Sequence, residues 1–179
     1  METNFRYDGS SRFPSDERWA FFPSASVGWR ISQEPWWNVK SEHISNAKVR
    51  FSWGSLGNAA GLSNYQYIQT LGISKSDYIL DGLRQNYMSS PAALPGNLTW
   101  ETATTYDIGA DLGFFDNRLT VSGDYYIRKT TDMIVNGPTV PDVFGASSPK
   151  GNYADMSTYG YELSLEWSCL LYTSPSPRD

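Results

Sequence analysis

The sequence predicts an all-β fold: about six long antiparallel strands that form a fragment of a large transmembrane β-barrel, and an open sheet when isolated. Apolar and polar side chains alternate along several segments, as in a strand with one dry face and one wet face. Several segments reach or exceed about ten residues, whereas strands in soluble domains average about 5–6 and a tilted membrane strand needs about 9–11. Long connections gather at one end of the strands, which is the asymmetry of outer-membrane barrels.

The expected strands are residues 1–8, 19–30, 47–57, 98–115, 118–135 and 157–168. Between the fourth and fifth, Asp116-Asn117 suits a two-residue hairpin turn, because Asp and Asn tolerate positive φ. This turn places Gly109 opposite Asp124 and sets apolar residues opposite apolar ones. A slip of one residue would mix the two kinds of side chain, so the pattern specifies the register.

Each strand then has an apolar face, assigned to lipid, and a polar face, assigned to the barrel lumen. Aromatic residues near strand ends fit the girdles that outer-membrane barrels carry at both membrane interfaces. The residues expected on the membrane side or in a girdle are Trp29, Trp53, Trp100, Tyr106, Ile108, Leu112, Val121, Tyr125, Leu163, Leu165 and Trp167. The residues expected to face the lumen are Arg50, Asp107, Asp111, Asp124, Glu162 and Glu166.

The connections are expected to sort by end. Residues 9–18, 58–97 and 136–156 fall at one end and are rich in Gly, Ser, Asn and Pro. The Asp116-Asn117 turn falls at the other end with residues 31–46, which are long for a periplasmic turn and are expected to hold a short helical segment. The longest connection is expected to contain a further hairpin around "YQYIQTLGI".

Composition excludes several classes of function. The 179 residues carry a net charge of −5 with no basic block, so a nucleic-acid-binding surface is not expected. Aromatic residues make up 15% of the chain, which suits a membrane interface. The single cysteine, Cys169, allows neither a disulfide framework nor a thiolate metal cluster, and no cofactor is expected.

The barrel wall is expected to occupy residues 1–168. Residues 169–179, "CLLYTSPSPRD", look like translated sequencing-adapter sequence and are expected to be a non-native tail. The prolines of this segment cannot continue a hydrogen-bonded ladder. The N-terminus shows no secretory signal, so the chain is expected to be truncated at both ends.

No residue is expected to be catalytic. His43 is the only histidine and has no evident nucleophile or orienting partner. Asp107 and Asp111 lie on one strand face about 13–14 Å apart, which is too far for a glycosidase pair. Trp36-Trp37 is expected to anchor at the periplasmic interface or to pack under the turn, in preference to a stacking platform. Four aromatic residues of the long loops either contact cargo or pack within the loops: Tyr65, Tyr67, Tyr87 and Phe144.

Four blocks of sequence resemble the SusC/RagA-type TonB-linked outer membrane transporters. They are "FRYDGSSRFPSDERWAFFPSASVGWRIS", "KVRFSWGSLGN", "NLTWETATTYDIGADLGFFDNRLTVSGDYYIRKTTDMI" and "GNYADMSTYGYELSLEW", which together cover nearly all of residues 4–167. The chain departs from the family at Trp53, where members usually carry Tyr, and at Thr158-Tyr159, where Asn-Lys is common. The order and spacing of the four blocks make the resemblance specific.

The resemblance implies a late portion of a twenty-two-stranded barrel closed around an N-terminal plug. It implies uptake of large glycans or peptides across the outer membrane, driven by the TonB complex through the N-terminal part that this chain lacks. It also implies a SusD-type lipoprotein that forms a lid over the extracellular mouth.

Three other functions compete with a transporter wall. A soluble carbohydrate-binding β-sandwich would bury the apolar faces between two sheets. An outer-membrane enzyme would need a Ser-His pair in the wall, and the sole histidine lies outside the expected strands. A passive porin has a similar wall, but the four blocks favour the TonB-linked group.

Overall fold

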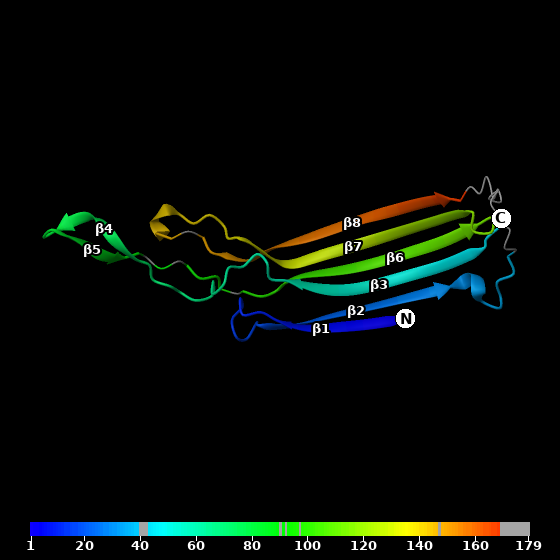
Figure 1. Ribbon diagram of the computed structural model, residues 1–179, viewed down its shortest axis with the longest axis horizontal. Helices are drawn as coiled ribbons and strands as arrows, with labels where there is room; N and C mark the ends of the chain where they lie inside the picture. Colours follow the sequence, from blue (N-terminus) through cyan, green and yellow to red (C-terminus); the bar gives the residue numbers. More distant parts are fainter. Residues whose placement is uncertain (40–42, 90, 92, 97, 147, 169–179) are drawn as a thin grey trace, which may run out of the picture.

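The computed structural model describes residues 1–39, 43–89, 91, 93–96, 98–146 and 148–168. Its main feature is one six-stranded sheet, in which every neighbouring pair is antiparallel and the strand order is β1-β2-β3-β6-β7-β8 (Figure 1). The strands are β1 (Glu2–Gly9), β2 (Trp19–Arg30), β3 (Asn46–Asn58), β6 (Glu101–Phe114), β7 (Leu119–Asn136) and β8 (Lys150–Trp167). The sheet is an up-and-down ribbon with open edges at β1 and β8, as predicted.

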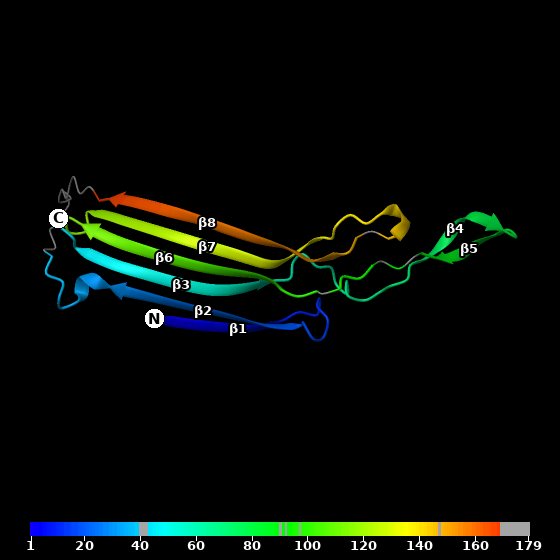
Figure 2. The same cartoon turned by 180° about the vertical axis from the view of Figure 1, so that it is seen from behind.

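The chain forms a second, two-stranded sheet between β3 and β6, which are themselves neighbours in the large sheet. It consists of β4 (Ile73–Leu80) and β5 (Leu83–Met88), and it projects past the end of the large sheet (Figures 1 and 2). Asp81 and Gly82 form its turn with φ of 51° and 76°, the positive values of a primed hairpin turn. The predicted hairpin around residues 65–73 was therefore placed too early along the chain.

The connections sort by end as predicted. Residues 10–18, 59–100 and 137–149 lie at one end of the sheet, here called the loop end. Residues 31–45 and 115–118 lie at the other, here called the turn end, and the predicted short helical segment is the 3-10 helix η1 (Ile31–Gln33). A second 3-10 helix, η2 (Asp142–Phe144), lies in the loop before β8.

The β6–β7 hairpin has the predicted register, with Gly109 opposite Asp124. Its turn closes with a hydrogen bond from the Arg118 N–H to the Phe115 carbonyl at 3.1 Å. Asp116 and Asn117 have φ of 55° and 62°, as both central residues of a type I′ turn require.

The start of β8 differs most from the prediction. Strand β8 begins at Lys150 and not at residue 157, and the β7–β8 register shifts twice near this start, between Thr130 and Ile134. There Asp132 adopts φ 56°, and its N–H donates to Asp155 Oδ1 at 3.0 Å. Between Met133 and Ile134 the extra residue is Tyr153 of β8, and an extra residue breaks the period-two alternation that identifies a strand.

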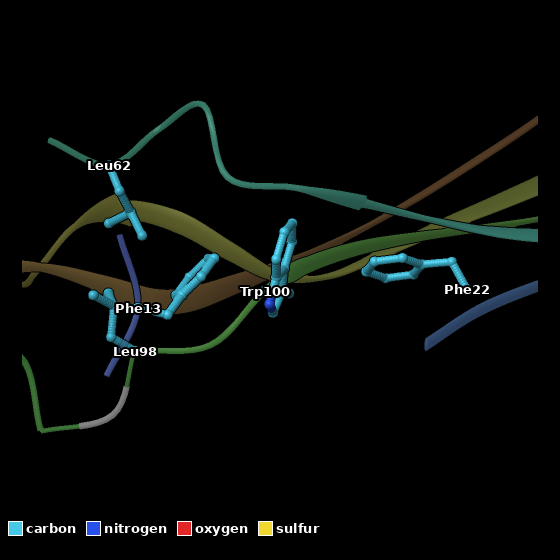
Figure 3. Close-up of a cluster of buried hydrophobic side chains, with 5 residues drawn as sticks. All are labelled: Phe13, Phe22, Leu62, Leu98 and Trp100. Atoms are coloured by element: carbon cyan, nitrogen blue, oxygen red, sulfur yellow. The ribbon is translucent and has the colours of Figure 1, made fainter. Parts of the chain in front are cut away.

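A buried cluster lies at the loop end (Figure 3). The Trp100 ring lies 4.8 Å from the Phe13 ring and 5.6 Å from the Phe22 ring, and Leu62 and Leu98 complete the cluster. Trp100 is 9% exposed, so its predicted place on the exposed membrane side was wrong. Strand β6 begins one residue later, at Glu101, and strand alternation does not assign a face to a residue outside the strand.

The apolar face of the large sheet is uncovered. Ile108, Leu163 and Leu165 on this face are 53%, 69% and 66% exposed. The second sheet lies beyond the loop end and over neither face (Figures 1 and 2). A β-sandwich is therefore wrong for this chain. No helix in the part of the chain that the structure describes is long and apolar enough to cross a membrane.

Candidate functional site: the two faces of the wall

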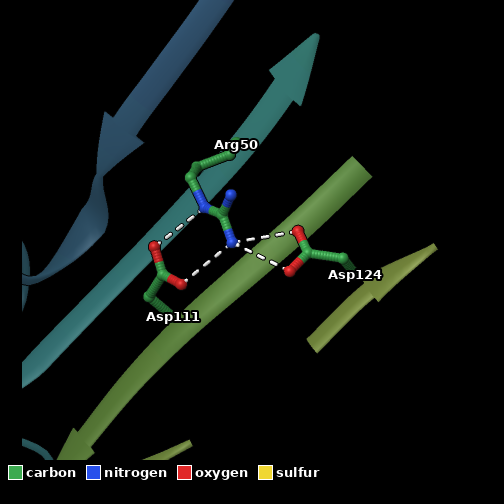
Figure 4. A network of polar contacts seen from close by, with 3 residues as sticks. All are labelled: Arg50, Asp111 and Asp124. Carbon is green, nitrogen blue, oxygen red and sulfur yellow. Dashed lines mark hydrogen bonds and ion pairs between the residues drawn. The ribbon is translucent and has the colours of Figure 1, made fainter. Parts of the chain in front are cut away.

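An ion-pair network occupies the middle of the polar face (Figure 4). The guanidinium of Arg50, on β3, binds Asp111 of β6 through two bonds, Nε to Oδ2 at 2.9 Å and Nη2 to Oδ1 at 3.1 Å. Its Nη2 also donates to the carboxylate of Asp124 on β7, at 2.9 and 3.1 Å. Because the three side chains are partly exposed, we assign each ion pair on the order of 1 kcal/mol.

A glycine makes this network possible. Arg50 and Asp124 belong to strands two apart, so the guanidinium must cross β6, about 10 Å from strand to strand. The residue of β6 between them is Gly109, which pairs with Arg50 on one side and Asp124 on the other. A Cβ on Gly109 would lie 2.0 Å from Asp124 Oδ1 and 3.0 Å from Arg50 Nη2. Glycine therefore leaves room for the crossing with the side chains as they stand, whereas any larger residue would require the Asp124 carboxylate to shift.

The other predicted lumen residues share this face. Asp107 and Glu162 line a shallow depression of about 560 Å³ beside the network, together with Tyr126 and Arg128. Glu166 pairs with Thr120 further toward the turn end, on the same face. Strand pairing thus brings all six predicted lumen residues onto one face: Arg50, Asp107, Asp111, Asp124, Glu162 and Glu166.

The opposite face carries an apolar band of membrane height. Along β6 the band runs from Tyr106 to Phe114, a length of about 27 Å at the rise of an extended strand. Two residues before Tyr106 on β6, toward the loop end, the same face becomes polar. The residues there are Thr104 and its partner on β7, Lys129. An outer-membrane barrel carries an apolar band about 25 Å tall, so the length of this band fits.

All predicted membrane-side residues except Trp100 lie on this face. Trp53 pairs with Tyr106 in the row nearest the loop end. The remaining residues, in rows toward the turn end, are Trp29, Ile108, Leu112, Val121, Tyr125, Leu163, Leu165 and Trp167.

Sequence reasoning missed an aromatic extension of the band on β1 and β2. The rings of Tyr7 and Trp19 stack at 5.3 Å, and those of Phe5 and Phe21 lie 6.1 Å apart. All four side chains are exposed. The signal was present in the sequence, because these residues alternate with polar or small ones along both strands.

The aromatic loop residues do not act as one group. Tyr65 and Tyr87 are exposed, whereas Tyr67 packs against the buried cluster and is a loop-packing residue. The side chain of Phe144 lies outside the described residues. His43 is exposed in the connection at the turn end.

A polar clamp at the loop end was also missed. Asn152 exchanges two hydrogen bonds with the backbone of Thr99, at 2.9 and 3.0 Å. The carboxylate of Glu101 accepts from Asn58 Nδ2 at 3.2 Å and from the Ile134 N–H at 3.3 Å. These bonds tie the start of β6 to β3, β7 and β8. Asn152 lies in a segment that was predicted to be loop, so no pattern pointed to it.

Comparison with known proteins assigns the family. A family model described as "TonB dependent receptor-like, beta-barrel" matches residues 2–176. The chain belongs to the TonB-dependent receptor β-barrel family. The predicted non-native tail, residues 169–179, lies outside the described residues.

Three proteins of known type are similar to this chain over most of its length. TonB-dependent receptor P3 of Formosa agariphila is 37% identical over 161 residues, which cover 89% of this chain and 16% of that protein. TonB-dependent receptor SusC of Bacteroides thetaiotaomicron is 35% identical over 165 residues, with the same two coverages. The solved RagAB peptide importer in its closed-closed state is 27% identical with a TM-score of 0.76, and the match covers 97% of this chain and 18% of that one.

The predicted resemblance to SusC and RagA is thus confirmed, and so is the predicted all-β barrel fragment. This TonB-dependent receptor segment is part of an outer membrane protein, and its relatives are receptors and transporters, which are not enzymes. The chain spans about a sixth of the length of the relatives named above, 16% of SusC.

Proposed function

We propose that the large sheet is a section of the barrel wall of a TonB-dependent transporter, with its apolar face against lipid and its polar face toward the lumen. The observation that carries this proposal is the uncovered apolar band of membrane height on a sheet whose other face is charged. In water such a band would be a large exposed apolar surface, which monomeric soluble proteins avoid. In a membrane it removes the same surface from water and leaves the ion pairs in the wet interior.

The ion-pair network supports the lumen side of the assignment. A guanidinium shared between two carboxylates leaves one negative charge in excess. Asp107 and Glu162 add to this charge, and Arg128 in the same depression offsets one of them. Charged groups at this depth are costly on the lipid face of a barrel strand, whereas a hydrated lumen accepts them. Hydrated, polar cargo is compatible with such a wall.

We further propose that the transporter takes up glycans or peptides. RagAB is a peptide importer, and the SusC resemblance extends the proposed cargo to glycans. The loop end would face the cell exterior beneath a SusD-type lipoprotein, with exposed loop residues such as Tyr65 and Tyr87 available to stack on cargo. Energy would come from the TonB complex through a part of the receptor outside these residues.

Uptake by the complete receptor tests this proposal. Cells that carry or lack the complete gene would be given fluorescent oligosaccharides and, separately, fluorescent peptides, with and without functional TonB. We expect gene-dependent uptake of one cargo class that disappears without TonB. Uptake that persists without TonB would instead indicate a passive pore. Affinity purification of the receptor from outer membranes would test for a co-purifying lipoprotein.

A further inference from the structure

The connection between β2 and β3, residues 31–45, is long for the turn end of a barrel, where β6 and β7 are joined by residues 115–118 alone. It opens with two successive tight backbone turns. The Glu34 N–H donates to the Ile31 carbonyl at 3.1 Å, and the Trp37 N–H donates to the Glu34 carbonyl at 3.0 Å. These turns bend the chain back, so that it stays beside the end of β2.

The second half of the bent segment lies on the apolar side of the sheet. Trp29 pairs with Val49 and belongs to the apolar face. Its Nε1 donates to Glu34 Oε1 at 2.8 Å, and its ring lies 6.3 Å from the Trp36 ring in an edge-to-face arrangement. Because Trp29 projects from the apolar face, both contacts place Glu34 and Trp36 on that side. Ser32, at the start of the segment, instead donates to Oδ1 of Asn46, a residue of the polar face, at 3.3 Å.

The far end of the connection is fixed as well. The Ser45 N–H donates to the Gly113 carbonyl at 2.7 Å, and the Asn117 N–H donates to Ser45 Oγ at 3.2 Å. The connection is therefore tied to the neighbouring β6–β7 hairpin at one end and to Trp29 at the other.

Trp36 extends the apolar band past the end of β2. Its side chain is 58% exposed, although its ring contacts both Trp29 and Trp37. None of the described residues accepts a hydrogen bond from Trp36 Nε1. A large ring with one polar N–H is favoured where hydrocarbon meets water, and this is why tryptophan gathers at membrane interfaces.

We propose that residues 31–37 form a membrane foot, in which Trp36 inserts into the headgroup region of the lipid leaflet at the turn end. The inference rests on the proposed lipid contact of the apolar face, with which Trp36 is continuous. A second aromatic pair, Phe115 and Trp167, lies at the same end with rings 6.4 Å apart. The membrane foot would anchor the turn end to lipid at the end of β2, and the Phe115–Trp167 pair would do so near the ends of β6 and β8.

The charge of the segment favours lipid over a protein partner. Residues 31–37 read "ISQEPWW", in which Glu34 is the single charged residue, and its carboxylate is engaged by Trp29. Residues 31–37 therefore offer no uncompensated charge that a charged periplasmic partner could bind. An amphipathic, neutral segment beside an apolar band suits the membrane boundary.

Spin labels in the complete receptor, reconstituted in liposomes, measure directly whether position 36 lies in lipid. In a receptor whose own cysteines are replaced by serine, single labels are placed at Trp36→Cys, at Asp116→Cys on the tip of the neighbouring turn and at Trp167→Cys in the apolar band. Accessibility to oxygen, which partitions into lipid, is compared with accessibility to a water-soluble nickel chelate. We expect the oxygen-to-nickel ratio at position 36 to be several-fold higher than at 116 and close to that at 167.

A ratio at 36 equal to that at 116, or low accessibility to both reagents because a protein covers the site, would overturn the membrane foot. Labels at Ile108→Cys and Leu165→Cys separate this failure from a failure of the lipid-facing wall, because they report on the band alone. Should the cysteine variant at 36 not fold, Trp36→Phe gives a second readout. It should remove part of the tryptophan fluorescence that lipids brominated near the headgroup quench, and an unchanged quenched fraction would also refute the inference.

Discussion

Replacing Gly109 with alanine tests the ion-pair crossing on the polar face. The new Cβ would lie 2.0 Å from Asp124 Oδ1, so the carboxylate must move by more than about 1 Å to reach ordinary contact. That movement breaks the bonds of 2.9 and 3.1 Å between Arg50 and Asp124. We expect a loss of about 1–2 kcal/mol in the free energy of unfolding, discounted for partial exposure.

The glycine-to-alanine change itself offsets part of this loss. Alanine restricts the unfolded chain and stabilises a compatible site by about 0.4–1 kcal/mol, so the net destabilisation should be about 1 kcal/mol. Gly123→Ala is the matched control, because its Cβ would meet Leu163 Cδ1 at 3.8 Å, an ordinary contact. That variant should be neutral or slightly stabilised.

The assay is urea unfolding of the complete receptor in detergent micelles, followed by tryptophan fluorescence. A double-mutant cycle adds Asp124→Ala, which removes the displaced carboxylate. In that background Gly109→Ala should destabilise clearly less, because only the tight contact with the Arg50 guanidinium, 3.0 Å from Nη2, remains. Equal midpoints for Gly109→Ala and Gly123→Ala, or the same loss with and without Asp124, would refute the reasoning.

Three further predictions address the cluster, the band and the edges. Trp100→Ala should cost about 3–5 kcal/mol and expose the loop-end connections to protease, whereas exposed Trp19→Ala should do neither. Ile108→Arg should lower the free energy of unfolding in liposomes by about 2–4 kcal/mol, and Asp107→Arg on the other face by less, with equal losses contradicting the assignment of faces. The isolated chain, with open edges at β1 and β8, should aggregate without detergent, so a monodisperse monomer that melts cooperatively contradicts the prediction.

The fold was predictable from sequence where local pattern decides it. The β6–β7 hairpin is the clearest case, because alternation on both strands and Asp116-Asn117 at the turn agree on one register. The β4–β5 hairpin was equally available, since Asp81-Gly82 is a strong turn signal, but its flanking strands alternate poorly. The extra residue Tyr153 hid the start of β8, because an extra residue reverses the alternation that sequence reasoning follows.

The sequence by itself determined which residues share a face, because a strand places successive side chains on opposite sides whatever its neighbours are. Only the tertiary structure decided which residues of a face meet. Arg50 reaches Asp111 and Asp124 because β3 lies beside β6, a pairing across residues 59–100 that no local pattern encodes. The position of Trp100 also depends on tertiary contacts. This residue lies outside the strand, and its ring packs against Phe13 and Phe22, which are distant in the sequence.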